Sequence, residues 1–224
     1  MPATLNLPAT SRQLLRTPRV VLRTWRSSDL LPFRALNADP DVMAEFPSVL
    51  TAEESDRLAF KAYDDHERDG FGLWVLELPG VADFAGIMGF NRPAFRPDDI
   101  EIVWRLERRH WSQGYAREAA RAALTAVLSE REPAVLTGLP LPVSVSNEIL
   151  EGVFTQRIEE VVAFTTATNR RSIRLMNNLS MTHDPADDFL HPALPPDHRL
   201  ARHVLYRLKR HDWMMHGETR IEPM

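Results

Sequence analysis

Cysteine is absent from this chain of 224 residues. Its absence excludes a disulfide scaffold, a thiol nucleophile and any zinc site built on thiolates. The sequence also lacks an apolar run long enough to span a bilayer, and its first residues lack the apolar centre of a secretory signal. We therefore expect a cytoplasmic protein that has no membrane partner.

An excess of positive charge is also missing. The chain has 27 Lys and Arg residues against 31 Asp and Glu residues, which gives a formal net charge of −4. Proteins that hold nucleic-acid phosphates usually carry a basic excess, so we expect no nucleic-acid partner. The hydrophobic share of 44% and the charged share of 26% are typical of a globular protein with one large domain or two small ones.

Hydrophobic periodicity predicts strands and helices that alternate in the middle of the chain. Thr51 and Glu54 predict a capping box at the start of a helix that Gly70 ends. The predicted strands are 18–26, 71–78, 84–90, 100–106, 161–165 and 202–208. The predicted helices are a short one that runs to about residue 37 after an N-cap within 27–29, and those at 52–69, 115–128 and 172–179. The pattern predicts an α/β fold of the mixed α+β kind, with a central mixed sheet flanked by helices.

The stretch 100–120 carries the clearest functional signal. A strand is followed by a short basic link and then by a helix, whose first free N–H groups favour an anion. Gly114 lets a ligand approach the backbone, and Arg108, Arg109 and Arg117 add positive charge for a pyrophosphate. The alternative is a plain strand–loop–helix connection. The sequence has neither GxxxxGK[ST] nor GxGxxG, so a P-loop or dinucleotide fold is not supported.

Trp111, Gly114 and Ala116 resemble the motif Gln/Arg-x-x-Gly-x-Gly/Ala, the acetyl-CoA-binding motif of the GNAT superfamily of N-acetyltransferases. Tryptophan in the first position is common in the RimJ/RimL-like branch of ribosomal-protein alanine N-acetyltransferases, whereas Ser112 stands where that branch usually has glycine. Further stretches of residues 17–210 resemble the same branch, namely 37–43, 50–54, 86–90 and 169–176, and Leu179-Ser180-Met181 stands where Leu-Gly-Phe is usual. The resemblance implies a GNAT-like, mostly antiparallel sheet.

The resemblance also implies that acetyl-CoA is the cosubstrate and that no metal takes part. It further implies roles for single residues. Glu101 matches the position of a general base in some GNAT enzymes, and its alternative is a solvated or salt-bridged strand glutamate. Ser172 is well placed to cap the late helix, and a serine there has been considered as the acid that protonates the leaving thiolate in this branch. The implied cofactor-binding residues are Trp104, Leu106, Arg109, Trp111, Gln113, Gly114, Tyr115, Ala116 and Asn169.

These observations favour an acetyl-CoA-dependent N-acetyltransferase. Its acceptor would be a primary amine, on a peptide or protein N-terminus or on a small molecule, which attacks the thioester directly in a ternary complex. The alternative is a non-catalytic acyl-CoA-binding protein with a degenerate GNAT fold. A hydrolase is less favoured, because the sequence has no GxSxG elbow and no paired Ser/His/Asp pattern.

The chain divides into an N-terminal arm (1–16), one acetyltransferase domain (17–210) and a C-terminal tail (211–224). An atypical insertion at about 132–160 interrupts the domain, and it is strongly apolar. Such a segment needs to be covered, and we favour a homodimer that buries it. The alternatives are that the segment folds over its own domain near the CoA cleft, or that it is a local excursion that only extends the core. The histidines near the C-terminus match no metal-binding spacing, and no metal site is expected; they are His183, His191, His198 and His203.

Overall fold

The computed structural model describes residues 7–128, 144–145 and 158–217. Its strands are β1 (Gln13–Arg16), β2 (Val21–Arg23), β3 (Leu73–Leu78), β4 (Ala82–Asn91), β5 (Glu101–Leu106), β6 (Ser144–Val145), β7 (Glu160–Thr166), β8 (Thr182–His183), β9 (Phe189–Leu190) and β10 (Arg202–Lys209). Its α-helices are α1 (Leu30–Ala38), α2 (Ala52–Asp69), α3 (Tyr115–Leu128), α4 (Arg170–Asn178) and the short α5 (Arg210–Asp212). The predicted alternation of strands and helices is confirmed.

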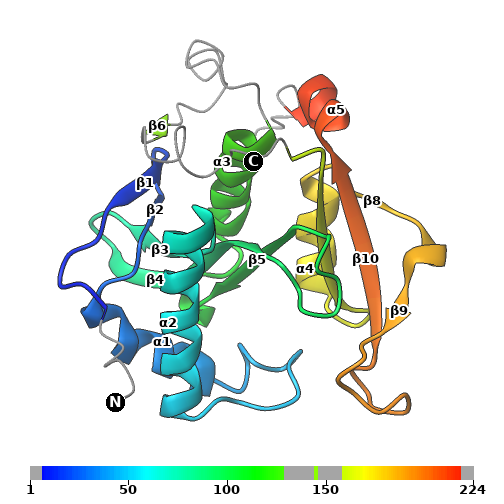
Figure 1. The fold of residues 1–224 in the computed structure, drawn as a ribbon, viewed down its shortest axis with the longest axis horizontal. Coiled ribbons are helices and arrows are strands. Elements are labelled where there is room, and N and C mark those ends of the chain that lie inside the picture. The colour runs from blue at the N-terminus through cyan, green and yellow to red at the C-terminus, as the bar shows by residue number, and fades with distance from the viewer. Residues whose placement is uncertain (1–6, 129–143, 146–157, 218–224) are drawn as a thin grey trace.

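The ten strands of the described residues form one sheet in the order β6-β1-β2-β3-β4-β5-β7-β10-β8, and β9 pairs with β10 (Figure 1). The pairs are antiparallel except β5 with β7, which is parallel. The prediction of a mixed, mostly antiparallel sheet flanked by helices is therefore confirmed. The parallel pair lies in the middle of the sheet, and the site described below is built around it.

Two hydrophobic clusters cover the two faces of the sheet. On one face α1 and α2 pack on β3 and β4, and Figure 1 shows α2 in front of these strands. On the other face α3 and α4 pack over β4, β5 and β7. The first cluster includes Trp25, Phe33, Leu36, Val75 and Ile87, and the second includes Trp74, Met88, Ile102, Ala123 and Met176. The strands are buried on both sides, which fixes their register.

Helix α2 begins and ends where the sequence predicts. The Thr51 side chain accepts a hydrogen bond from Glu54 N–H at 3.2 Å, and Glu54 Oε2 accepts one from Thr51 N–H at 2.8 Å. Gly70 then takes a left-handed φ of 72° and ends the helix. Helix α3 also has the predicted bounds, because its apolar stripe faces the sheet without interruption.

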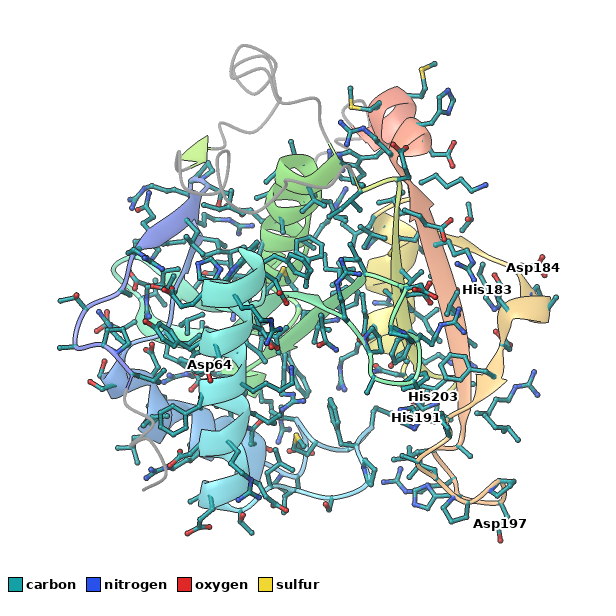
Figure 2. All side chains as sticks on the ribbon, viewed as in Figure 1. Asp64, His183, Asp184, His191, Asp197 and His203 are labelled. Atoms are coloured by element: carbon teal, nitrogen blue, oxygen red, sulfur yellow. The ribbon has the colours of Figure 1, made fainter. Side chains whose placement is uncertain are left out.

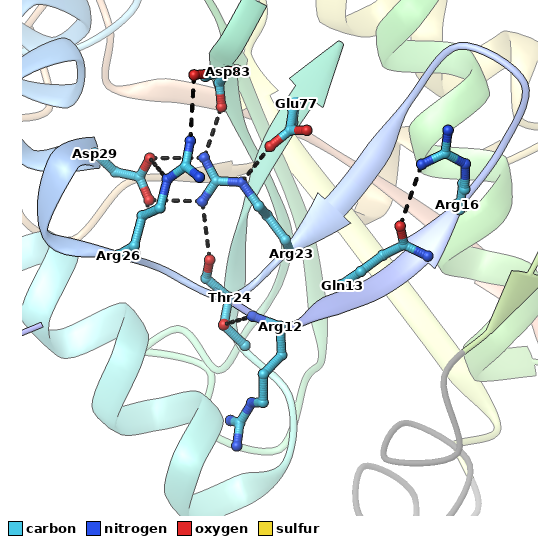
Figure 3. Close-up of polar contacts among 9 residues, drawn as sticks. All are labelled: Arg12, Gln13, Arg16, Arg23, Thr24, Arg26, Asp29, Glu77 and Asp83. Carbon is cyan, nitrogen blue, oxygen red and sulfur yellow. Dashed lines mark hydrogen bonds and ion pairs between the residues drawn. The ribbon is translucent and has the colours of Figure 1, made fainter. Parts of the chain in front are cut away.

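A buried ionic network joins β2 to β3 and to the start of α1 (Figure 3). The guanidinium of Arg23 donates to both carboxylate oxygens of Asp29 at 2.8 Å and to Glu77 Oε2 at 2.8 Å. It also donates to the carbonyl oxygens of Thr24 and Asp83 at 3.1 and 2.7 Å. Every N–H direction of this buried cation is thus used, so the charge is compensated inside the protein.

The predicted N-terminal arm contributes a strand to the sheet. Residues 13–16 form strand β1, which pairs with β2, and Leu14 and Leu15 are buried. Burial of two leucines stabilises the strand, so the sheet begins before the predicted domain boundary. Of the predicted tail, Trp213 is buried in the core as well. Most of the predicted insertion lies outside the described residues. Of its described residues, 144–145 form β6, which pairs with β1, Ile158 is buried, and Glu160 begins β7.

No helix among the residues that the structure describes is both long and apolar enough to cross a membrane.

Candidate active site

The sheet opens between β5 and β7. These strands pair at one position only, Glu101 opposite Val162, where Val162 N–H donates to the Ile100 carbonyl at 2.8 Å. Beyond it, β5 runs on to Leu106 paired with β4 alone, and β7 runs on to Thr166 paired with β10 alone. Within the described residues, the inner edge of β5 after Glu101 therefore has no strand partner. Unpaired backbone groups inside a sheet are available to a ligand.

Helix α3 begins just beyond the end of β5 with free N–H groups. The backbone N–H groups of residues 113–117 donate to no acceptor in the described part of the chain, and the first bond runs from Glu118 N–H to Gly114 C=O at 3.0 Å. Gly114 has a φ of 83°, and a Cβ there would lie 3.2 Å from Arg19 Nη2. This helix start has the geometry that an anion such as a pyrophosphate requires.

Arg19 also contacts this helix start, a contact that the sequence analysis did not predict. Its Nε donates to Glu118 Oε2 at 2.7 Å, its Nη1 donates to the Gln113 carbonyl at 3.1 Å, and its guanidinium lies 5.0 Å from the Tyr115 ring centroid. Thr17 Oγ donates to the same Glu118 carboxylate at 2.6 Å. A signal was present in the sequence, since a glutamate in the first turn of an apolar helix needs a cation when it is buried.

The loop between β5 and α3 is held by its own side chains. Trp111 Nε1 donates to the Leu106 carbonyl at 2.8 Å, and Gln113 Nε2 donates to the Arg109 carbonyl at 2.7 Å. Arg109 itself pairs with Glu107 at 2.7 Å and is exposed. The structure thus brings the cofactor residues predicted between 104 and 116 together at the end of β5. Their contact with a cofactor stays a prediction.

Two serines occupy left-handed positions where the resembled branch usually has glycine. Ser112 has a φ of 59° and Ser180 a φ of 60°. A non-glycine residue in this region is strained by about 1 kcal/mol or more. The backbone of both loops therefore keeps a conformation that favours glycine, although the side chains differ.

Glu101 lies on the face of β5 opposite to Ile102. It is 9% exposed, and its Oε2 accepts a hydrogen bond from Asn91 Nδ2 at 3.4 Å. Burial raises the pKa of Glu101 to about 8, and the Asn91 hydrogen bond opposes this shift. The alternative of a solvated or salt-bridged glutamate is therefore wrong. A carboxylate with a pKa near neutral pH is suited to accept a proton from an ammonium.

The prediction that Ser172 caps the late helix is wrong. Helix α4 begins at Arg170, and its cap is Asn169, whose Oδ1 accepts the Ser172 N–H at 3.2 Å. Asn169 Nδ2 also donates to Thr165 Oγ1 at 2.9 Å. The helix starts two residues earlier because the asparagine side chain satisfies its N–H. Ser172 Oγ instead accepts a hydrogen bond from Trp104 Nε1 at 3.3 Å, so it joins α4 to β5 across the opening.

The 39–50 loop, which joins α1 to α2, contacts both sides of the opening. On the β5 side, Asp41 pairs with Arg108, and the Arg105 guanidinium lies 4.2 Å from the Phe46 ring centroid. On the β7 side, Glu45 accepts hydrogen bonds from the hydroxyls of Thr166 and Thr168. The loop therefore lies over the face of the sheet that carries Glu101.

An open depression of about 530 Å³ lies beside this loop. Helix α1 and the segment after β5 form its walls, and its lining residues are Ala35, Leu36, Asp39, Glu107, Arg108 and Arg109. Its two arginines are compensated by acids, because Arg108 pairs with Asp41 and Arg109 pairs with Glu107.

The C-terminal histidines form no group of three or more metal-binding side chains in the described part of the chain. His191 and His203 lie side by side, with ring centroids 5.0 Å apart, and His183 lies near Asp184 (Figure 2). His183 Nε2 is hydrogen-bonded to Asp188 Oδ1 at 2.8 Å, and its ring stacks on Tyr206. These contacts account for the histidines by packing and hydrogen bonding.

The fold and the opened sheet define an acetyltransferase of the GNAT type, and comparison with known proteins agrees. The family described as acetyltransferase (GNAT) domain matches residues 19–182. The chain belongs to this family, whose members transfer an acetyl group from acetyl-CoA.

Three individual proteins that are similar to this chain differ from it at most aligned positions. The uncharacterized protein YkkB of Bacillus subtilis (strain 168) is 31% identical over 120 residues, which are 53% of this chain and 70% of that protein. A GNAT-family acetyltransferase of Bacillus anthracis is 18% identical with a TM-score of 0.64, over 88% of this chain and 99% of that one. A RimL ribosomal L7/L12 α-N-protein acetyltransferase in complex with coenzyme A is 14% identical with a TM-score of 0.61, over 91% of this chain and 97% of that one. The two structures support the fold.

Proposed function

We propose that this protein is an N-acetyltransferase that transfers the acetyl group of acetyl-CoA to a primary amine by direct attack in a ternary complex. The observation that carries the proposal is the buried Glu101, which lies where β5 and β7 separate and has a pKa of about 8. An amine is protonated at neutral pH, so its attack on a thioester requires a base at the reacting centre.

The residues of the chain have separate tasks in this reaction. The free N–H groups at residues 113–117 bind the pyrophosphate of acetyl-CoA, and Arg19 adds positive charge beside them. The inner edge of β5 after Glu101 offers backbone N–H groups to the oxygen of the thioester, which gains negative charge during attack. Asn169 lies at the start of α4, where the resemblance places a contact with the pantetheine arm.

Proton transfers accompany the exchange. The ammonium first loses one proton to Glu101, which passes it to solvent. A C–N bond then forms between the free amine and the acetyl carbon, the C–S bond breaks, and Glu101 takes the second proton that the nitrogen loses and releases it to solvent. Ser172, whose hydroxyl is held by Trp104, gives a proton to the leaving thiolate and regains one from solvent. The products are an acetylated amine, free CoA and one proton released to solvent, so atoms and charges balance.

Release of free CoA thiol from acetyl-CoA across a panel of amines tests this function. Glu101→Gln should lower the rate by about 100-fold or more, with unchanged affinity for acetyl-CoA in calorimetry. Glu53→Gln is the matched control, because Glu53 lies in the first turn of α2 and has no part in the site. A non-catalytic acyl-CoA-binding protein would bind acetyl-CoA and release no thiol above background with any amine.

The finer expectations rest on the sequence. We propose membership of the RimJ/RimL-like branch, with support from the Trp111 motif and from the fold similarity to RimL. We also propose a cytoplasmic location and a homodimer, with support from the absence of cysteine and from the apolar composition of residues 132–160. Light scattering at micromolar concentration tests the dimer, and a monomeric mass would overturn it.

A further inference from the structure

Arg105 is a largely buried cation on the same face of β5 as Glu101. Its Nη1 donates to Asn37 Oδ1, and its guanidinium stacks on Phe46 at 4.2 Å. Its Nε is buried without any hydrogen-bond partner, and its Nη2 donates to no group in the described part of the chain. No carboxylate of the described residues lies within ion-pair distance of this side chain. A charge that is removed from water without an acidic partner is costly to keep.

The acids of the loop that covers Arg105 have other partners. In the 39–50 loop that covers Arg105, Asp39 accepts the backbone N–H of Asp41 at 2.8 Å, and Asp41 pairs with Arg108. Glu45 accepts two threonine hydroxyls on the β7 side of the opening. Asn37 is also fixed, because its Nδ2 donates to Ser55 at 2.8 Å. The surroundings of Arg105 thus hold it in place with a neutral amide and an aromatic ring.

The unused atoms of Arg105 form one edge of its guanidinium. Nε and Nη2 point in parallel and match the two oxygens of a carboxylate. Elsewhere in this protein the same edge is occupied by an acid: Arg34 binds Asp56 through Nε at 2.7 Å and Nη2 at 2.5 Å. Arg68 binds Asp69 through the same two atoms at 2.9 and 2.6 Å. At Arg105 this edge has no acid in the described chain.

Arg105 lies close enough to Glu101 for one acceptor molecule to contact both side chains. Residues 101 and 105 lie on one face of one strand, and four residues of strand span about 13 Å. Both side chains are long, so a small molecule can place its amine at Glu101 and an anionic group at Arg105. The 39–50 loop lies over Arg105, so a compact group reaches it more readily than the surface of a folded protein does.

We propose that Arg105 binds a carboxylate of the acceptor, and that the acceptor is therefore a small amine that carries a carboxylate several bonds away from its nitrogen. This inference rests on the proposed acetyl transfer and names its substrate class. Nη2 makes the first contact, and Nε joins when the packed side chains around it shift. The carboxylate of the acceptor supplies the acidic partner that the Arg105 guanidinium lacks among the described residues.

The experiment compares matched acceptors of equal length: 6-aminohexanoate with 6-aminohexanamide, and a dipeptide with its C-terminal amide. For the wild type, kcat/KM should be about 10–100-fold higher for the carboxylates. Arg105→Gln should remove this preference by lowering kcat/KM for the carboxylates, with little change for the amides. Arg105→Lys keeps the charge without the fork and should fall between the two. Arg16→Gln removes an exposed arginine charge as a control.

A binding measurement separates this inference from the proposed function. Calorimetry titrates 6-aminohexanoate into the protein saturated with CoA, in the wild type and in Arg105→Gln. Binding that Arg105→Gln weakens at least tenfold supports the carboxylate subsite even if no amine is acetylated, in which case the proposed function alone fails. If amines are acetylated, equal rates for carboxylates and amides in the wild type, or equal losses for both in Arg105→Gln, would overturn the inference. If none is acetylated, equal binding of 6-aminohexanoate by the two proteins would overturn it.

Discussion

At the scale of single residues, burial of the Glu101 carboxyl group, which we propose as the base, makes stability depend on pH. Burial raises its pKa to about 8 from an ordinary value of 4.5. The protonated form is therefore the one that the folded state prefers. The contribution of Glu101 to stability is complete below about pH 4.5 and is lost as the pH rises through about 8. The same shift makes the group an effective base near neutral pH.

We expect Glu101→Gln to have a higher free energy of unfolding than the wild type at pH 9, and a smaller increase over the wild type at pH 5. The amide resembles the protonated carboxyl group and carries no charge at any of these pH values. The increase in the free energy of unfolding at pH 9 should exceed the increase at pH 5 by at least about 1.4 kcal/mol, the free energy of one pKa unit. Thermal unfolding of both proteins at pH 5 and pH 9 measures it. An identical pH dependence for the two proteins would contradict the raised pKa.

At the scale of elements, the start of α3 depends on contacts made by a distant strand. Arg19, which precedes β2, holds Glu118 of the first turn and the carbonyl of Gln113. Gly114 leaves room for this guanidinium at a φ of 83°. The helix start, its free N–H groups and the positive charge beside them thus form one unit. A side chain at residue 114 should disturb all three.

We expect Gly114→Val to weaken CoA binding at least tenfold, or about 1.4 kcal/mol. Its branched Cβ opposes the left-handed backbone and crowds Arg19 Nη2, which lies 3.2 Å from the position of a Cβ. Calorimetry with CoA measures the affinity. Gly80→Val is the matched control: Gly80 has a φ of 75°, with nothing within 4 Å of a Cβ, in the turn between β3 and β4. Equal affinities for both variants would remove the Gly114 region from CoA binding.

At the scale of the whole molecule, two halves of the sheet are held in register around the opening between β5 and β7. The 39–50 loop contacts both sides of it, and Trp104 bonds to Ser172 across it. The N-terminal half is secured by the Arg23 network, which ties β2 to β3 and to the turn before α1 (Figure 3). The Arg23 network therefore stabilises the half of the sheet from which the 39–50 loop extends over the site.

We expect Asp29→Ala to reduce the free energy of unfolding by about 3–5 kcal/mol, because it leaves the buried Arg23 charge without its main partner. Asp29 is 1% exposed, whereas the carboxylate of the control, Asp56, pairs with the more exposed Arg34. Asp56→Ala should cost about 1 kcal/mol or less. Urea unfolding of both variants gives the comparison. A similar small loss in each would show that the buried network contributes little.

The sequence by itself determined most of the elements. The capping box at Thr51 and the apolar stripe of 115–128 set the bounds of α2 and α3, because these signals are local and act within a few residues. The alternating strands around residue 101 likewise appeared where the pattern predicts them. The resemblance carried by Trp111 and Gly114 led to the family, which the comparison confirmed.

Only the tertiary structure decided how distant residues meet. It replaced Ser172 by Asn169 as the cap of α4, since a cap depends on the turn before the helix. It brought Arg19 to Glu118, 99 residues apart, and placed Asn37 and Phe46 around Arg105. Burial of Glu101, and hence its raised pKa, follows from the packing of the whole sheet. The periodicity of the sequence indicates on which face of a strand or helix a side chain lies. Which charged groups and rings it contacts there depends on the fold of the entire chain.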